Sequence, residues 1–181
     1  VEVVILDKND SPPEFKNIPP AYLASEDMAP GQRIATIAAE DPDTIGSITY
    51  SIQNDEPTPF SLDPRTGLLT LKDPLDRETT SEYQIIVRAD DGIQFTDVTV
   101  VVQVTDTNDN PPVFKESAYS FDIAENAARG AVVGTVAAID PDSGPNAQLT
   151  YTVISDWAND VFSLNPQTGV FTLTARLDYE E

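Results

Sequence analysis

The 181-residue chain contains no cysteine and no histidine. Without cysteine there is no disulfide framework and no thiolate metal site, although the redox compartment stays open. Without histidine the chain lacks the usual general base, the commonest transition-metal ligand and any Ser-His or Cys-His catalytic pair. Any polar site must therefore be built mainly from carboxylates, amides, hydroxyls and backbone groups.

Positive charge is scarce as well. Ten Lys and Arg residues stand against 31 Asp and Glu residues, which gives a net charge of −21. Nucleic-acid binding needs a basic face, so no nucleic-acid partner is expected, and the scattered basic residues suggest no other anionic partner. At 40% hydrophobic residues the chain lies far from the disordered class, so its acids need a local explanation.

Long apolar runs are also missing. No stretch approaches the 18 apolar residues of a membrane-spanning helix, and the first residues do not resemble a signal peptide. The sequence starts within a β-rich segment and stops at Glu181. We therefore expect it to be a piece of a longer protein.

What the chain does contain is an internal repeat. The segment Asp7-Lys8-Asn9-Asp10-Ser11-Pro12-Pro13 recurs as Asp106-Thr107-Asn108-Asp109-Asn110-Pro111-Pro112. Further pairs keep the same order: Ser25-Glu26-Asp27 with Ala124-Glu125-Asn126, Asp41-Pro42-Asp43 with Asp140-Pro141-Asp142, and Leu75-Asp76-Arg77-Glu78 with Leu177-Asp178-Tyr179-Glu180. The Pro-Pro step cannot pair in a sheet and favours an extended path, so each copy of the first motif is expected to be a stiff linker.

The segments between these motifs read as strands. Apolar and polar residues alternate at 33–38, 48–52 and 69–71, and β-branched runs occupy 83–87 and 98–102. Asp-Pro and Thr-Gly turns separate them, and no helical period of useful length occurs. We therefore predict an all-β chain of tandem seven-stranded Greek-key, immunoglobulin-like sandwiches joined by metal-binding linkers.

The repeat also sets the expected domain boundaries. Residues 1–13 are predicted to be the last strand and linker of a preceding unit. Residues 14–110 form one complete unit of ordinary domain size. Residues 111–181 form the following unit, which stops before counterparts of the strands at 83–89 and 97–104.

The acids of the repeated motifs point to a hard divalent cation. Calcium takes six to eight oxygens, chiefly from carboxylates and backbone carbonyls. Each motif alone has an ordinary interpretation, for example Asp-Pro-Asp as a turn or Asp90-Asp91-Gly92 as a hairpin turn. Two carboxylates about 4 Å apart repel by roughly 4 kcal/mol at an effective dielectric constant of about 20. Acids gathered twice at the poles of the sandwiches therefore favour metal binding.

Together these motifs resemble tandem extracellular cadherin repeats. The Asp-x-Asn-Asp-Asn-Pro-Pro linker, the Glu26 segment, Asp-x-Asp, Leu-Asp-Arg-Glu and Ala89-Asp90-Asp91 all match the family pattern, over almost the whole chain. The resemblance implies about three calcium ions per complete linker, sharing residues. The first would use Glu26, Asp76, Glu78 and Asp109. The second would use Glu26, Glu78, Asp106, Asp109, Asp142 and the carbonyl of Thr107. The third would use Asn108, Asp140, Asp142 and the carbonyls of Asn110 and Asn146.

For the first linker the resemblance implies only a site of the third type. Its ligands would be Asn9, Asp41, Asp43, Asp91 and the carbonyl of Ser11. Two departures weaken it: Ser11 replaces the family's asparagine, and the short Thr44-Ile45-Gly46 loop has no counterpart of Asn146. Asn9-Asp10-Ser11 is formally a glycosylation sequon, although Pro12 follows it.

The resemblance implies calcium-dependent cell-cell adhesion or tethering by interior repeats of a cell-surface rod. The expected partner is another cadherin, homophilic or heterophilic, with no small-molecule substrate and a membrane anchor only outside this segment. The alternative is a cadherin-like calcium-binding module of a bacterial surface or carbohydrate-binding protein. Carboxylate pairs can also hydrolyse glycosides without histidine, but repetition at every junction suits structure better than one catalytic cleft, so no enzyme activity is expected.

Overall fold

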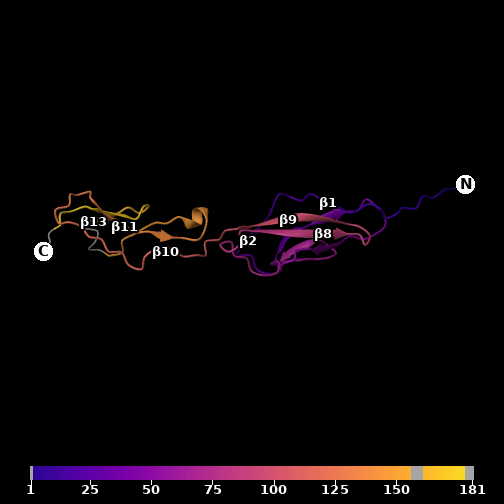
Figure 1. Ribbon diagram of the computed structural model, residues 1–181, viewed down its shortest axis with the longest axis horizontal. Helices are drawn as coiled ribbons and strands as arrows, with labels where there is room; N and C mark the ends of the chain where they lie inside the picture. Colours follow the sequence, from indigo (N-terminus) through magenta and orange to yellow (C-terminus); the bar gives the residue numbers. More distant parts are fainter. Residues whose placement is uncertain (1, 156–160, 178–181) are drawn as a thin grey trace. The chain divides into compact units, whose positions relative to one another are not determined.

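The computed structural model describes residues 2–155 and 161–177 (Figure 1). Contacts divide the chain into two compact units, Val1–Thr107 and Asn108–Glu181. The regular structure in the described ranges is β-strand apart from one short 3-10 turn, which confirms the all-β prediction. No helix in these ranges is long and apolar enough to cross a membrane. Residues 2–10 form no strand, and Val3, Val4 and Ile5 are exposed.

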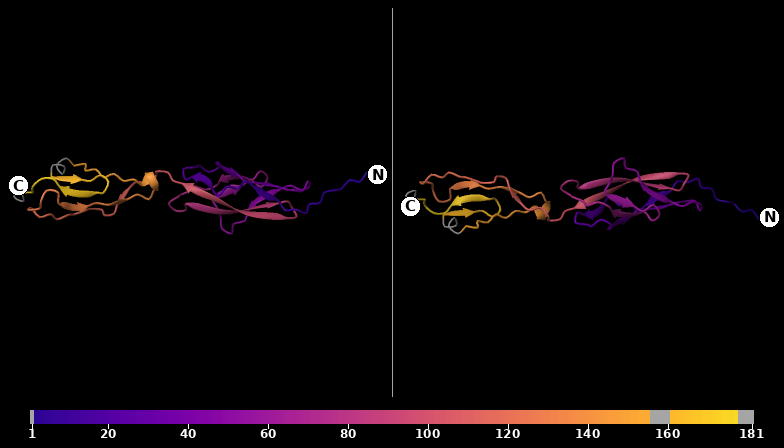
Figure 2. Two further views of the ribbon diagram at one scale, coloured as in Figure 1. Left: turned by 90° about the horizontal axis from the view of Figure 1, so that it is seen from above. Right: turned by 90° about the horizontal axis from the view of Figure 1, so that it is seen from below.

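One layer of the first unit is a four-stranded sheet. Its order is β2 (Tyr22–Ser25), β9 (Phe95–Thr105), β8 (Glu82–Asp90) and β5 (Thr49–Ile52). The long β8 and β9 form an antiparallel hairpin, whereas β2 runs parallel to β9. Figures 1 and 2 show this hairpin stacked against the strands of the other layer.

The second layer combines two short sheets. One has the order β3 (Arg33–Thr36), β7 (Leu68–Leu71), β6 (Phe60–Leu62), and the other pairs β1 (Glu14–Lys16) with β4 (Ala38–Glu40). Only Ile37 separates β3 from β4, so these two segments are one strand with a break. Likewise β1 and β2 are the two halves of a first strand that changes sheet. The nine segments therefore amount to a seven-stranded sandwich, as the sequence predicts.

The core lies between the two layers and follows the period-two pattern. Alternate residues of β8 and β9 point inward, and Ile85, Val87, Val100 and Val102 are fully buried. They pack in one buried cluster with residues of the facing layer, among them Ile37, Leu69 and Leu71. Since no disulfide is present, this packing is what holds the unit together.

The second unit repeats one layer of the first. Its sheets are β11 (Val132–Thr135), β14 (Val170–Leu173) and β13 (Phe162–Leu164) in that order, and β10 (Val113–Phe114) with β12 (Ala138–Ile139). The 3-10 turn η1 (Gly144–Ala147) occupies its longer loop. The hydroxyl of Tyr151 accepts the backbone N–H of Ala138 at 3.0 Å, as Tyr50 accepts that of Ala39 at 2.9 Å. The four-stranded layer has no counterpart among the described residues of this unit.

Both units contain the same kind of turn, Asp63-Pro64-Arg65-Thr66-Gly67 in the first and Asn165-Pro166-Gln167-Thr168-Gly169 in the second. The Asp63 carboxylate accepts N–H bonds from Arg65 at 3.0 Å and Thr66 at 2.8 Å, together with the Thr66 hydroxyl at 2.8 Å. Asn165 takes the corresponding N–H bonds from Gln167 and Thr168, both at 3.0 Å. The Thr66 N–H, then its hydroxyl and the Arg65 N–H, lower the pKa of Asp63. The aspartate turn is thus pH-sensitive in a way that the asparagine turn is not.

Asp63→Asn is expected to keep the turn and remove this part of the pH dependence. A carboxyl with a lowered pKa contributes stability above its unfolded-state pKa, and that stability is lost as the pH falls through the folded-state pKa. The wild-type first unit should therefore lose more stability than the variant on acidification below about pH 4. Melting temperatures of both proteins at neutral and acid pH measure the difference. Equal losses would show that the turn does not depend on this charge.

Candidate metal centre

The predicted ligands of the first unit gather at its two ends. Asp91 follows β8 at the hairpin turn, whereas Asp106 follows the far end of β9. β9 has 11 residues at a rise of about 3.3 Å each, so these ends lie roughly 35 Å apart. We call Asn9, Ser11, Asp41, Asp43 and Asp91 the N-terminal cluster, and Glu26, Asp76, Glu78, Asp106 and Thr107 the C-terminal cluster.

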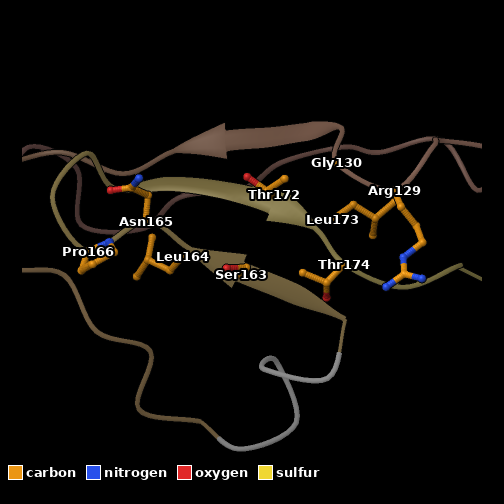
Figure 3. A pocket seen from close by; sticks show the side chains of 9 residues that line it. All are labelled: Arg129, Gly130, Ser163, Leu164, Asn165, Pro166, Thr172, Leu173 and Thr174. Carbon is orange, nitrogen blue, oxygen red and sulfur yellow. The ribbon is translucent and has the colours of Figure 1, made fainter.

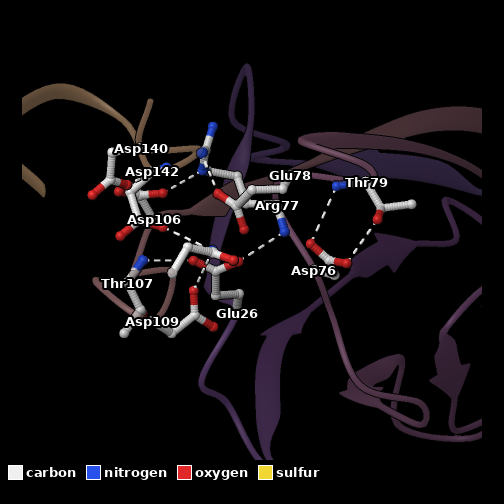
Figure 4. Close-up of polar contacts among 11 residues, drawn as sticks. Glu26, Asp76, Arg77, Glu78, Thr79, Asp106, Thr107, Asp109, Asp140 and Asp142 are labelled. Atoms are coloured by element: carbon white, nitrogen blue, oxygen red, sulfur yellow. Dashed lines mark hydrogen bonds and ion pairs between the residues drawn. The ribbon is translucent and has the colours of Figure 1, made fainter. Parts of the chain in front are cut away.

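The C-terminal cluster is placed by the parallel pairing of β2 and β9. Because the two strands run in one direction, Glu26 and Asp106, which follow them, emerge at the same pole. The Glu26 N–H continues the ladder by donating to the Thr105 carbonyl at 3.2 Å. Its carboxylate accepts the N–H of Thr107 at 2.6 Å and that of Arg77 at 2.8 Å (Figure 4). Glu26 is only 8% exposed.

Three acids of the C-terminal cluster converge. Glu26, Asp76 and Glu78 each offer one carboxylate oxygen, and these oxygens lie within 4.8 Å of one another. The Thr79 hydroxyl donates to Asp76 at 2.7 Å and lowers its pKa. Desolvation raises the pKa of Glu78, and the neighbouring charge of Glu26 adds to the effect. This is an oxygen donor set that suits a hard cation, which would relieve the repulsion.

Arg77 lies beside the C-terminal cluster, and sequence reasoning gave it no role. Its guanidinium forms ion pairs with Glu78 and with Asp106 (Figure 4). The signal was present in the sequence, since Leu-Asp-Arg-Glu puts a cation between two acids. A positive charge thus contacts two predicted calcium ligands.

The N-terminal cluster is held by backbone amides. The Asp43 carboxylate accepts the N–H groups of Asp10 and Ser11, both at 2.8 Å. Asp91 accepts those of Gln94 at 2.7 Å and Ile93 at 2.6 Å, and these bonds lower its pKa. Asp91 is therefore kept charged, and the hydrogen bonds fix both carboxylates in place.

Two polar atoms of the N-terminal cluster lack ordinary partners. The Asp41 Oδ1 atom accepts the Asp43 N–H at 2.9 Å, but Asp41 Oδ2 is buried with no hydrogen-bond partner in the described part of the chain. The Asn9 carbonyl oxygen lies 3.0 Å from Asp91 Oδ2 and 3.3 Å from Asp43 Oδ2. Either a cation between these oxygens or an amide turned to donate its N–H groups would remove the repulsion. Four side chains predicted as ligands thus share one small region.

Two further contacts of the N-terminal linker were not foreseen. The Thr44 N–H and hydroxyl donate to Asp7 at 2.6 and 2.7 Å. Gly46 packs on the cluster, since a Cβ there would lie 3.1 Å from Asn9 Nδ2. The short Thr44-Ile45-Gly46 loop therefore approaches the site through backbone, without the asparagine that its counterpart carries.

The second unit contains its own share of predicted ligands. Asp142 is 6% exposed, and its Oδ2 is buried without a hydrogen-bond partner among the described residues. The Asn110 side chain donates to Asp142 and to Asp109, both at 2.8 Å. Ser11, which replaces asparagine in the first linker, has no amide for such bonds, and its backbone N–H contacts Asp43 instead.

A recess of the second unit collects the remaining ligands. Asn108, Asp140 and Asn146 all line this hollow of about 420 Å³. The predicted linker crosses the division of the chain, because Asp106 and Thr107 close the first unit whereas Asn108, Asp109 and Asn110 open the second. Asp178 and Glu180, the repeat counterparts of Asp76 and Glu78, lie outside the described residues. Glu125, the counterpart of Glu26, is exposed.

A second groove, of about 640 Å³, offers a contrast (Figure 3). It lies along β13 and β14, and its lining contains one charged side chain, Arg129, with no acid and no aromatic ring. Another recess is aromatic, but Tyr151 and Phe114 there correspond in the repeat to Tyr50 and Phe15 of the first unit's core. Neither hollow is lined by a predicted calcium ligand.

Comparison with known proteins shows which family the chain belongs to. The model of the Cadherin domain matches residues 21–105 and again residues 119–181. The chain belongs to the cadherin family. Cadherin domains bind calcium in general, and the carboxylate, amide and carbonyl oxygens found in both units fit that ion.

Relatives and solved structures agree with this cadherin assignment. Protocadherin Fat 4 of Homo sapiens is 41% identical over 182 residues, covering 99% of this chain and 4% of that protein. Protocadherin-11 X-linked of Sus scrofa is 37% identical, covering 99% and 16% respectively. The chain thus spans a small part of the curated relatives that it matches.

Two solved cadherin structures share the fold. The extracellular domain of Protocadherin GammaB4 is 28% identical with a TM-score of 0.86, over 97% of this chain and 31% of that one. Mouse Cadherin-23 EC22-24 is 32% identical with a TM-score of 0.84, over 97% and 58%. These likenesses confirm the predicted family and the immunoglobulin-like sandwich.

Proposed function

We propose that this chain is a pair of interior cadherin repeats, stiffened by calcium, in the extracellular part of a protein for calcium-dependent cell-cell adhesion or tethering. The observation that carries the proposal is the convergence of Glu26, Asp76 and Glu78, whose carboxylate oxygens lie within 4.8 Å. Such a set of like charges favours the binding of a divalent cation. The family supports calcium as that cation.

The proposed complete linker, residues 106–110, takes about three ions. Glu26, Asp76 and Glu78 contribute with Asp109 to the first ion. Asp106 and the Thr107 carbonyl join the second, together with Asp142. Asn108, Asp140, Asp142 and the carbonyls of Asn110 and Asn146 provide the third. The buried Asp142 oxygen without a hydrogen-bond partner in the described ranges supports its double role.

The first linker is proposed to hold one ion of the third type. Its ligands are the side chains of Asn9, Asp41, Asp43 and Asp91 and the carbonyl of Ser11. Support comes from the Asn9 side-chain amide, which lies against Asp91 and Asp43, and from the buried Asp41 oxygen that has no hydrogen-bond partner among the described residues. The domain limits proposed from the sequence, 1–13, 14–110 and 111–181, put each linker between two repeats.

Calcium then controls the linkers rather than the sandwiches. Extracellular modules bind calcium with dissociation constants of about 10⁻⁴–10⁻³ M, so the sites fill outside the cell and empty in the cytosol. Filled linkers hold neighbouring repeats in a fixed relation, which adhesion under load requires. We propose another cadherin, of the same or a different kind, as the partner, at the outer face of the plasma membrane and with no enzymatic role.

Calcium titration tests the proposal directly. Wild-type protein should bind calcium with a dissociation constant in the submillimolar to millimolar range, and Asp109→Ala should weaken binding at the second linker without unfolding either sandwich. Isothermal titration calorimetry measures the binding and circular dichroism the fold. Asp73→Ala is the matched control, since Asp73 is an exposed acid paired with Lys72 at 3.6 Å. An Asp109→Ala titration identical to that of the wild type would contradict the ligand assignment.

The same samples test the mechanical role. With a chelator present, the linker should flex and become protease-sensitive near residues 105–112. Small-angle scattering with and without chelator measures the flexing. Superimposable profiles and unchanged cleavage would refute stiffening by calcium even if calcium binds.

A further inference from the structure

Arg77 is an unusual neighbour for calcium ligands. The chain has only ten Lys and Arg residues against 31 Asp and Glu residues, yet one of the ten, Arg77, contacts both Glu78 and Asp106. Its backbone N–H also donates to Glu26, at 2.8 Å. The residue is therefore anchored in the C-terminal cluster at its backbone and at its guanidinium.

The contacts of Arg77 are largely shielded from solvent. Its side chain is 18% exposed, and those of Glu78 and Asp106 are 19% and 12% exposed. Partly buried charges are screened by salt much less than surface pairs. Burial works against the charged guanidinium, but the hydrogen bonds and charges of Asp106 and Glu78 prevail and raise the pKa of Arg77. The group stays positive at every physiological pH.

A guanidinium and a calcium ion make competing demands on the same two acids. Both need the carboxylate oxygens, and each repels the other when close by. Without calcium, however, the carboxylates of Glu26, Glu78 and Asp106 are still gathered at one end of the first unit. A resident cation makes that calcium-free state tolerable.

We propose that Arg77 is an internal cation that neutralises Glu78 and Asp106 when calcium is absent and gives them up when calcium binds. It thereby sets the calcium concentration at which the linker fills. This inference rests on the calcium sites of the proposed function. Arg77 is a tuning residue, whereas the acids are the ligands.

The repeat itself supplies an alternative residue for this position. Leu75-Asp76-Arg77-Glu78 corresponds to Leu177-Asp178-Tyr179-Glu180, so the following repeat has tyrosine in place of the arginine. The second repeat thus has the two flanking acids, as Asp178 and Glu180, but no basic residue between them. Arg77→Tyr is therefore a substitution that the repeat sequence already contains.

The experiment compares Arg77→Gln, Arg77→Tyr and Arg77→Lys with the wild type in two measurements. The first is the calcium dissociation constant, which should fall about three- to tenfold in the Gln and Tyr variants because the competing charge is gone. The second is the melting temperature in chelator, which should fall in the same variants because the acids lose their counter-ion. Arg77→Lys should lie between, since a lysine keeps the charge but not the two-sided contact.

Arg88→Gln is the matched control. Arg88 pairs with Asp97 at 2.8 Å on the outer face of β8 and β9, so its loss should leave the calcium affinity unchanged. Unchanged or weaker calcium binding in Arg77→Gln and Arg77→Tyr would refute the proposal that Arg77 competes with calcium for Glu78 and Asp106. An unchanged melting temperature in chelator would overturn the neutralising role. If the wild type binds no calcium, the proposed function fails, whereas the chelator measurement still tests the ion pairs by themselves.

Discussion

Replacing Glu26 with glutamine is expected to weaken calcium binding at the second linker by about tenfold or more, that is by at least about 1.4 kcal/mol. Glu26 is proposed as a ligand of two ions, and the affinity of such sites depends on ligand charge. Its side chain is 8% exposed, so little water can take over its role. Calcium titration of the purified chain measures the change.

Glu26→Ala should show a second effect that glutamine largely avoids. The carboxylate accepts the N–H groups of Thr107 and Arg77, and alanine would leave both donors without that acceptor. Each unsatisfied buried donor costs about 1–3 kcal/mol, so the first unit should melt at a lower temperature even in chelator. Glu125→Gln, at the exposed equivalent position, is the control. Normal calcium affinity in Glu26→Gln would remove Glu26 from the ligand set.

Gly67→Ala is expected to destabilise the first unit by about 3–5 kcal/mol, more than most single substitutions do. Gly67 adopts φ +67°, and a Cβ there would lie 2.0 Å from the carbonyl oxygen of Ile37. The obstacle is backbone, so no side-chain rotation can relieve it. Moving apart would break the bond from the Ile37 N–H to the Gly67 carbonyl, which is 2.8 Å long. Urea unfolding of the first unit measures the loss.

Gly31→Ala separates this clash from backbone strain. Gly31 has φ +91°, but nothing lies within 4 Å of its would-be Cβ, so alanine there should cost only about 1–2 kcal/mol. Gly169 repeats the close approach, with a Cβ 2.2 Å from the Val136 carbonyl oxygen. If the Gly67→Ala protein is no less stable than Gly31→Ala, the segments around Gly67 and Ile37 can move apart without cost, and the predicted clash is wrong.

Much of the fold could be predicted because it depends on local alternation. The runs 33–38, 48–52 and 69–71 each lie over a strand of the first unit, and 83–87 and 98–102 lie within β8 and β9. The division of the first strand into β1 and β2 could not be predicted. It depends on which sheet offers a free edge to each half, and that is a property of the tertiary structure rather than of any short segment.

The candidate metal site, too, could be predicted only in part from the sequence. Acids in repeated motifs identified the clusters, and the convergence of Glu26, Asp76 and Glu78 supports their grouping. The sequence did not reveal that Arg77 pairs with Glu78 and Asp106, because ion pairing depends on where a long side chain turns. The use of the Asn110 amide to hold Asp142 was missed for the same reason.

The parallel pairing of β2 with β9 has a mechanical consequence. Tyr22 to Ser25, which follow β1 near the start of the first sandwich, pair with Val102 to Thr105 at its end. Tension that draws those two ends apart pulls the paired strands in opposite directions along their length. The interstrand bonds are then sheared together instead of being unzipped one after another. The sandwich should therefore yield to stretching only at high force, whatever happens at its joints.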